Sequence, residues 1–403
     1  MKRLLMSRTP LPGWHDRPGN ARTWPSIPYV IVYTRLPCVF LILLTFLFIA
    51  CSGTDTLSST SPINTSAANA QPTTTPAIMA TGNFYEYSLP QSHSGLMRPA
   101  IDHEGRLWFG EMGHNYLAVF DPRTQTLRQM TPPQGRSGIM GVAVAPDNTI
   151  WFAEQSANYI GHYFPSSGQY QVYSLPTVTI PDPGDAGKML SLPSAPNDVT
   201  LDARGNVWFT ELNADSLGRL DTHTGNIRQY PLSAKKSFQT LDPYGVTVDQ
   251  QGMVWFTESS NNHLGRLDPA TGKISFFMMP GLGANTALME IASDVHGMIW
   301  ATAFTAGLLL SFNPRSSTFT PYYAPSSGNG TSGLYGLTIT PNGQVWVTVA
   351  AENVIARLDV AGRRFIYYPI PTKGSLPLGV VIGANNALWF TEAGSDKIGM
   401  LQP

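Results

Sequence analysis

The chain has 403 residues, a formal net charge of -1 and only 13 % charged residues, against roughly 25 % in an average domain. This composition has no basic excess that would hold nucleic acid, and no charged run typical of an interaction tail. With 37 glycines and 33 prolines, the sequence favours a fold that is rich in turns.

Residues 1–51 have the pattern of an export signal. The stretch from Leu36 to Cys51 is almost wholly apolar over about fifteen residues and follows Arg35, whereas a membrane-spanning helix needs roughly 20. Its length suits the apolar region of a signal peptide, and the closing tetrapeptide FIAC resembles a bacterial lipobox, whose cysteine becomes lipidated. A lipid anchor, an ordinary cleaved signal and an uncleaved anchor all remain open. We expect an exported protein, either an envelope lipoprotein or secreted, that meets the membrane only through this N-terminus.

The next segment, residues 52–82, predicts a disordered tether. It is rich in Ser, Thr and Pro and has almost no aliphatic periodicity. Both cysteines of the chain, Cys38 and Cys51, precede it. The exported part therefore has neither a disulfide nor a thiolate metal site. We expect the folded domain, a monomer, at residues 83–403.

Seven tryptophans recur about 45 residues apart, with one longer gap between the second and the third. They are Trp108, Trp151, Trp208, Trp255, Trp300, Trp346 and Trp389. Each lies in a repeat of four short apolar or alternating runs separated by Asn-, Gly- or Pro-bearing turns, with no helical period. Four-stranded units of this size are propeller blades. The sequence therefore predicts an all-β, seven-bladed β-propeller of four-stranded blades.

The two ends of residues 83–403 predict how the ring closes. The last repeat stops after its third strand, at residues 397–403, whereas residues 83–90 form an orphan strand that resembles the fourth strands at 226–233 and 364–371. We expect this N-terminal strand to complete the last blade. Closure would remove the two largest exposed sheet edges.

A polar residue recurs in the turn after the second strand of each blade, and an acid ends that strand in five blades. The turn residues are Asn115, Asn158, Asp215, Asn262, Gly307, Asn353 and Asp396, a set that suits tight left-handed turns. The acids are Glu111, Glu154, Glu211, Glu258 and Glu392. Because strands one and two are antiparallel, these acids are expected around the axial mouth. Two roles remain open: accepting N–H bonds from the neighbouring blade, or holding a divalent cation through hard oxygen ligands.

Residues found at the mouth of a single blade are better functional candidates than repeated ones. We expect Arg98, Asn197, Glu290 and Tyr335 to bind a ligand. Asp242, Tyr244 and Glu258 form a second set, in which the two acids, together with Glu392, are the candidate metal ligands and Tyr244 the candidate base. The insertion at 177–195 explains the longer tryptophan gap. It is either a cover for the mouth or a plain surface insertion.

The cassette WFTE followed by N-x-x-G-R-(L/I)-D resembles the virginiamycin B lyase (streptogramin lyase) family across residues 83–403. The resemblance implies a seven-bladed propeller that opens a cyclic depsipeptide at its ester by elimination. It also implies Mg²⁺ and a histidine that abstracts the proton, with the metal stabilising the developing negative charge.

The residues that the resemblance implies for catalysis are only partly present. The family motif Glu-x-His-Gly falls on Leu376 and Leu378, and Tyr335 stands where a substrate-binding histidine is implied. Glu392 matches the glutamate that would complete the metal site. Leucine neither accepts a proton nor binds magnesium, so the family's catalytic motif is not retained.

The nearest partial match is DPYG at 242–245, which keeps carboxylates at Asp242 and Glu258 but has Tyr244 in place of the base. We therefore expect the propeller to bind a small-molecule or peptide ligand, or a partner, at its axial mouth, with Mg²⁺ or Ca²⁺ as the candidate cation. The competing hypotheses are a Mg²⁺-dependent C–O lyase acting on a cyclic depsipeptide, with Tyr244 as the base, and a lactonase-like metal hydrolase.

Overall fold

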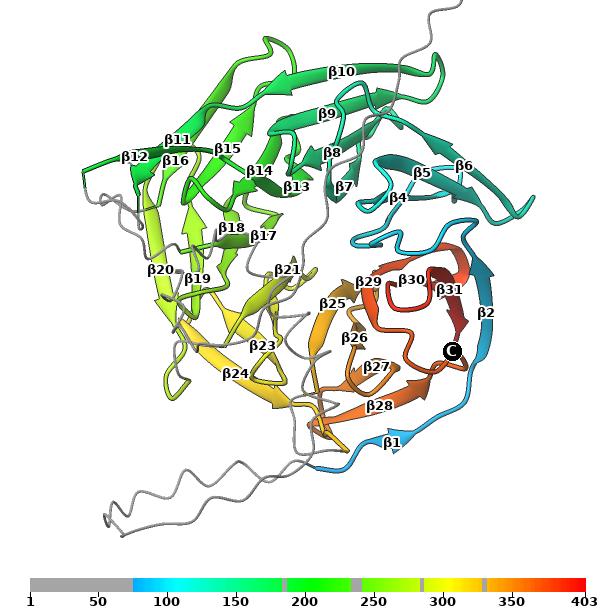
Figure 1. The fold of residues 1–403 in the computed structure, drawn as a ribbon. Coiled ribbons are helices and arrows are strands. Elements are labelled where there is room, and N and C mark those ends of the chain that lie inside the picture. The colour runs from blue at the N-terminus through cyan, green and yellow to red at the C-terminus, as the bar shows by residue number, and fades with distance from the viewer. Residues whose placement is uncertain (1–74, 183–186, 233–240, 283–285, 328–331) are drawn as a thin grey trace, which may run out of the picture. The chain divides into compact units, whose positions relative to one another are not determined.

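The computed structural model describes residues 75–182, 187–232, 241–282, 286–327 and 332–403 (Figure 1). They all belong to one compact unit, Ala70–Pro403. The expected export signal at 1–51 and most of the expected tether lie outside the described residues. Within the described ranges, no helix is long and apolar enough to cross a membrane.

The unit contains seven four-stranded antiparallel sheets, which are the blades of a β-propeller (Figure 1). Blade 1 consists of β3 (Ala100–Ile101), β4 (Leu107–Glu111), β5 (Tyr116–Asp121) and β6 (Thr126–Met130), and blade 2 of β7 (Ile139–Val144), β8 (Ile150–Glu154), β9 (Tyr159–Phe164) and β10 (Gln169–Ser174). Blade 3 consists of β13 (Pro196–Leu201), β14 (Val207–Glu211), β15 (Ser216–Leu220) and β16 (Ile227–Pro231), and blade 4 of β17 (Pro243–Val248), β18 (Val254–Glu258), β19 (His263–Leu267) and β20 (Ile274–Met278). Blade 5 consists of β21 (Leu288–Ser293), β22 (Ile299–Ala303), β23 (Leu308–Asn313) and β24 (Thr318–Tyr323), and blade 6 of β25 (Leu334–Ile339), β26 (Val345–Val349), β27 (Val354–Asp359) and β28 (Arg364–Pro369). Blade 7 consists of β29 (Pro377–Ile382), β30 (Leu388–Glu392), β31 (Lys397–Gln402) and β2 (Asn83–Ser88), so the predicted fold is confirmed.

The N-terminal strand closes the ring as predicted. β2 pairs with β31 over six residues, from Asn83 opposite Gln402 to Ser88 opposite Lys397. The last residues of the expected tether differ from the prediction, because β1 (Ile78–Met79) pairs in parallel with β28 and adds a fifth strand to that sheet. The open edge of β28 supplies backbone partners there, and one of them is the Tyr367 carbonyl, which accepts the N–H of Ala80 at 2.8 Å.

The second strand of every blade is buried along its whole length because both of its faces pack against neighbouring blades. Trp208 of blade 3, for example, lies in one apolar cluster with Val254 and Phe256 of blade 4. The phenylalanine that follows the tryptophan lies on the opposite face of the second strand, and it packs on a glycine of the third strand. A Cβ atom added to Gly265 would lie 1.9 Å from the Phe256 ring. The repeated Trp-Phe pair and the glycine that follows it therefore serve blade packing.

The indole N–H of the cassette tryptophan is tied to an aspartate six residues earlier. Trp255 Nε1 donates to Asp249 Oδ2 at 2.7 Å, and the same bond occurs in blades 1, 3 and 5. The other oxygen of Asp249 accepts the N–H groups of Gln251 and Met253. This aspartate therefore satisfies a buried indole and closes the hairpin between strands one and two.

The recurrent polar turn is structural, as predicted. All seven turn residues have a positive φ, between 47° and 67°, which Asn, Asp and Gly tolerate best. Several also hold the loop that enters the next blade. Asn353 Oδ1 accepts the Ser375 N–H at 2.8 Å, and Asp396 Oδ1 accepts the Ser94 N–H at 2.7 Å.

The insertion before blade 3 forms a separate two-stranded hairpin, made of β11 (Thr177–Pro181) and β12 (Met189–Pro193). Met189 and Leu190 are 57 % and 37 % exposed, whereas Ile180 is buried. A covering role for this hairpin at the mouth stays a prediction. Apart from one short 3-10 turn, η2 (Ala384–Asn386), the described part of the chain contains no helix.

Candidate functional site

The innermost strands place one position of each blade close to its neighbour, ten residues before the cassette tryptophan. Blades 2, 4, 6 and 7 carry glycine there, and a Cβ atom on Gly336 would lie 2.1 Å from the Leu378 carbonyl. Blades 1, 3 and 5 carry Arg98, Asp198 and Glu290 instead. Three charged side chains therefore occupy a level at which the other blades have none.

Arg98 connects these blades through a single guanidinium. Its Nε donates to Glu290 Oε1 at 2.6 Å and lies 3.7 Å from Asp198 Oδ1. The guanidinium carbon is 4.7 Å from the centre of the Tyr244 ring, within the range of a cation–π contact. The side chain of Arg98 thus touches blades 3, 4 and 5 from its own position in blade 1.

Two phenols lie beside this guanidinium. The hydroxyls of Tyr244 and Tyr335 are hydrogen-bonded to each other, and both side chains are at most 1 % exposed. Asn197 donates to the Tyr244 carbonyl at 2.9 Å and accepts from the Gln155 side chain at 3.1 Å. We call Arg98, Asp198, Tyr244, Glu290 and Tyr335 the axial cluster.

The structure brings four sequence-predicted residues together in this cluster, namely Arg98, Tyr244, Glu290 and Tyr335, and places Asn197 against its backbone. Sequence reasoning missed Asp198 and Gln155. The signal for Asp198 was available, because it lies ten residues before its tryptophan, in the same register as Arg98 and Glu290.

Two carboxyl groups share one guanidinium in the axial cluster. Burial raises the pKa of Glu290 to about 7, and the charge of Asp198 adds to this rise while Arg98 opposes it. Burial also raises the pKa of Asp198. Removing a charge from water is costly, so a proton at Glu290 is readily gained near neutral pH. Burial raises the pKa of Tyr244 to about 12, so this phenol is protonated at neutral pH.

The cassette glutamates differ from the expectation that they bind the neighbouring blade. Four of the five have hydrogen-bond partners in their own blade, where Glu211 accepts from Ser216 at 2.6 Å and from Gln229 at 2.8 Å. The blade-to-blade bond is made by the preceding threonine. Thr257 donates to the Met289 carbonyl at 2.6 Å and accepts the Gly245 N–H at 2.9 Å. Threonine lies in the face that meets the next blade because side chains alternate along a strand.

The three predicted metal ligands lie in two blades. In blade 4, Asp242 accepts from Ser260, and Glu258 Oε2 lies 2.9 Å from His263 Nδ1. Glu392, in blade 7, accepts from Ser395 at 3.0 Å. In the ranges that the structure describes, no group of three or more His, Cys, Asp or Glu residues could hold a metal ion. Mg²⁺ or Ca²⁺ binding at these acids stays a prediction, and no chemical step is built on it.

The electrostatics of Glu258 do not favour an ionised ligand. Burial raises its pKa to about 8, and the charge of Asp215 adds to the rise. The Oε1 atom of Glu258 is buried without a hydrogen-bond partner among the described residues. Burial lowers the pKa of His263, so the pair is held together largely without charge separation at neutral pH.

The positions where the resemblance implies a catalytic Glu and His are both leucine. Leu378 is 2 % exposed, and Leu376 has a φ of 48°. The unusual backbone at Leu376 is a feature of the repeat. The equivalent residues of the other blades also have positive φ, and they are Gly95, Gly138, Ala195, Asp242, Ala287 and Gly333.

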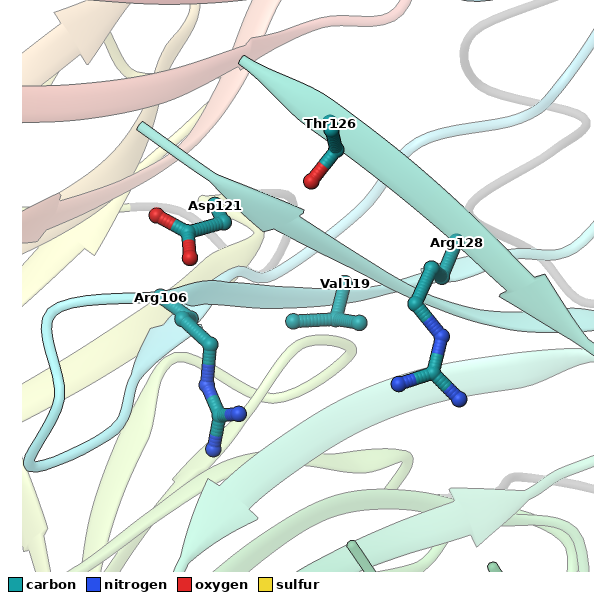
Figure 2. A pocket seen from close by; sticks show the side chains of 5 residues that line it. All are labelled: Arg106, Val119, Asp121, Thr126 and Arg128. Carbon is teal, nitrogen blue, oxygen red and sulfur yellow. The ribbon is translucent and has the colours of Figure 1, made fainter. Parts of the chain in front are cut away.

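A hollow of about 110 Å³ lies in blade 1, at the end of the strands opposite Glu111 (Figure 2). It is lined by Arg106, Val119, Asp121, Thr126 and Arg128. Val119 lies opposite the cassette tryptophan of blade 1. Blades 3, 4 and 6 have the larger arginine at this position, so the short valine side chain leaves the space open. Arg106 is already paired with Asp102 at 2.6 Å, and Asp121 with Arg123 at 3.2 Å. This hollow is therefore polar and nearly balanced in charge.

Fold and site together define the protein as a closed seven-bladed propeller with a charged cluster on its axis. A sequence model described as the virginiamycin B lyase family matches residues 182–330 and 285–403, together more than half of the chain. The chain belongs to the virginiamycin B lyase family. A comparison with curated proteins found no match.

Solved structures of similar fold include two lyases of this family. Virginiamycin B lyase from Staphylococcus aureus is 24 % identical with a TM-score of 0.69, over 80 % of this chain and 99 % of that one. A streptogramin B lyase is 25 % identical with a TM-score of 0.69, over 79 % and 97 %. The extracellular domain of a hybrid two component system from B. thetaiotaomicron is 18 % identical with a TM-score of 0.59, over 79 % and 42 %. The likenesses at 24 % and 18 % identity show the fold alone.

Proposed function

We propose that this protein is an exported member of the family that binds a ligand at its axial mouth and does not carry out the family's elimination chemistry. The observation that carries the proposal is the state of Arg98. Its Nη1 and Nη2 atoms are buried and have no hydrogen-bond partner among the described residues. A buried charged donor without an acceptor is costly, so this site favours a molecule that supplies oxygen acceptors.

The charged side chains of the axial cluster keep a small part of their surface in contact with solvent. The side chains of Arg98, Asp198 and Glu290 keep 8 %, 11 % and 12 % of their surface exposed. Tyr244 and Tyr335 lie beneath them and are almost fully buried. A ligand would thus meet the three charged groups first.

The residues present argue against elimination. Leu376 and Leu378 replace the acid and the base that the family motif implies, and a phenol with a pKa of about 12 is a poor general base at neutral pH. Incubation with a streptogramin B-type cyclic depsipeptide and Mg²⁺ should therefore leave the ester intact, as followed by mass spectrometry. A ring-opened product that disappears in Tyr244→Phe would contradict this part of the proposal.

Export is supported by the apolar segment that ends at Cys51. The sequence leaves open whether a lipid anchor or a plain cleaved signal is used. Metabolic labelling with a radioactive fatty acid in a bacterial host, compared between the natural sequence and Cys51→Ala, distinguishes the two. Labelling that is lost in Cys51→Ala supports the anchor, and export without label supports the cleaved signal.

Ligand binding is tested by thermal denaturation with a panel of small carbonyl compounds, sugars and short peptides. A ligand bound only to the native state raises the melting temperature. Compounds that do so should lose their effect in Arg98→Lys and keep it in Arg128→Lys, which changes an exposed arginine of blade 1. Binding that is independent of Arg98 throughout the panel would overturn the axial site.

The second candidate is an enzyme at blade 4, either a Mg²⁺-dependent C–O lyase or a lactonase-like metal hydrolase. The unpartnered Oε1 of Glu258, in the same blade as Asp242, favours it. Mg²⁺ or Ca²⁺ should then raise the melting temperature of the wild type and have no effect on Asp242→Ala or Glu258→Ala. The absence of a cation-dependent shift would remove this candidate.

A further inference from the structure

Resting on the proposed function, we propose that the axial ligand carries a carboxylate, which binds Nη1 and Nη2 of Arg98 and becomes the charge partner of the guanidinium while Glu290 takes up a proton.

The unused donors of Arg98 match two oxygens on one carbon. A guanidinium has five N–H donors in a planar fork, and Nε is the atom that already serves Glu290. Nη1 and Nη2 lie side by side and are both unpartnered. Two parallel N–H bonds to a carboxylate satisfy such a pair, whereas one amide or ester carbonyl offers a single oxygen. The Tyr244 ring beneath the guanidinium favours its flat orientation.

The two acids beside Arg98 differ in how firmly they are held. Asp198 accepts backbone N–H bonds from Val199 and Val246, each at 3.0 Å. The hydrogen bond that the structure records for the Glu290 carboxylate comes from Arg98. Glu290 is therefore the acid that can give up its charge, while the backbone N–H bonds favour the ionised form of Asp198.

Adding a ligand carboxylate conserves the charge of the cluster only if Glu290 takes up a proton. The charged and titratable groups that face Glu290 are Arg98, Asp198, Tyr244 and Tyr335. With Glu290 ionised, one cation faces two anions. With Glu290 protonated and a ligand carboxylate bound, the count is the same. The proton comes from solvent, and the pKa of Glu290, raised by burial to about 7, makes it available near neutral pH.

The test uses propionate and its neutral amide, propionamide, as probes of equal shape. Titration calorimetry and thermal denaturation of the full chain at pH 6.5 should show saturable binding of propionate and none of propionamide. Above pH 7 the affinity for propionate should fall, approaching about tenfold per pH unit. Arg98→Lys should weaken binding more than tenfold, and Arg128→Lys should leave it unchanged.

Glu290→Gln keeps the test decisive if Arg98→Lys fails to fold. Glutamine carries no charge at any pH, so propionate binding to this variant should lose its pH dependence between pH 6 and 8. Equal binding of propionate and propionamide through Arg98 would overturn the carboxylate inference and leave the proposed function standing. Binding of propionate that survives in Arg98→Lys, or no binding to the wild type, would overturn the inference as well. If other ligands of the thermal-denaturation panel bind through Arg98, the proposed function stands and only the carboxylate inference fails.

Discussion

Two sets of buried acids behave differently in this propeller. Glu211 belongs to a set that recurs in five blades and bonds to Ser216 and Gln229 of its own sheet. Asp198 and Glu290 occur once each and face an arginine from another blade. The comparison teaches that repetition in such a fold marks blade packing, whereas a charged residue that interrupts the repeat marks a site. It follows that repeated positions should control stability and single positions should control binding.

The largest expected effect comes from a repeated glycine. Gly265→Ala would place a methyl group 1.9 Å from the Phe256 ring, in a core with no room for it, and should cost about 3 kcal/mol or more. Urea denaturation measures the loss. Gly135→Ala, at a position where a Cβ atom meets nothing within 4 Å, is the control and should stay within about 0.5 kcal/mol. Equal stability of the two variants would contradict the packing role of the repeat.

A repeated threonine should have the next largest effect. Thr257→Val removes the hydroxyl that joins blade 4 to blade 5 and leaves the Met289 carbonyl and the Gly245 N–H unpaired. We expect a loss of about 1–3 kcal/mol in the free energy of unfolding, with ligand binding at the axis retained. An unchanged free energy would show that the blade-to-blade bond contributes nothing.

The single acid Glu290 should control the pH dependence of stability. Its pKa in the folded protein is raised to about 7 from an ordinary value of 4.5. The folded state therefore holds this proton more tightly than the unfolded state, and stability should fall as pH rises from about 4.5 to about 7. Glu290→Gln should flatten this slope, a change of up to about 3 kcal/mol across the window, since one pKa unit corresponds to about 1.4 kcal/mol. Chemical denaturation at pH 5, 6, 7 and 8 measures it. A slope equal to that of the wild type would contradict the raised pKa.

The smallest expected effect concerns the repeated acid Glu154. It is fully buried, neither of its carboxyl oxygens has a partner among the described residues, and burial raises its pKa to about 7. As at Glu290, the folded state holds this proton more tightly than the unfolded state, so the wild type should lose stability as pH rises from about 4.5 to about 7. The difference in free energy of unfolding between Glu154→Gln and the wild type should therefore be about 1 kcal/mol more favourable to the variant at pH 8 than at pH 5. Axial ligand binding should not change, and a loss of binding would break the distinction between the two sets of acids.

The fold was predictable because the information is repeated. The seven tryptophans fix the number of blades, and the orphan strand at 83–90 with the incomplete last repeat fixes the closure. The direction of the cassette glutamates was also available from strand alternation, which puts Glu258 on the face of Phe256 and Thr257 on the face of Trp255.

The axial cluster was only partly predictable. Register alone places Arg98 and Glu290 at equivalent positions of different blades, ten residues before the tryptophan, and Tyr244 and Tyr335 one residue earlier. Which side chains meet depends on how far each one reaches across the axis, and Arg98 and Glu290 are 192 residues apart in the chain. No local pattern records such a contact, so the pairing of this guanidinium with Glu290, and with the unpredicted Asp198, needed coordinates.

The most direct test of the distinction is titration of propionate into three proteins at pH 6.5: the wild type, Arg98→Lys and Glu154→Gln. Our account predicts saturable binding to the wild type, equal binding to Glu154→Gln and a loss of more than tenfold in Arg98→Lys. Binding that is lost in Glu154→Gln and kept in Arg98→Lys would contradict it.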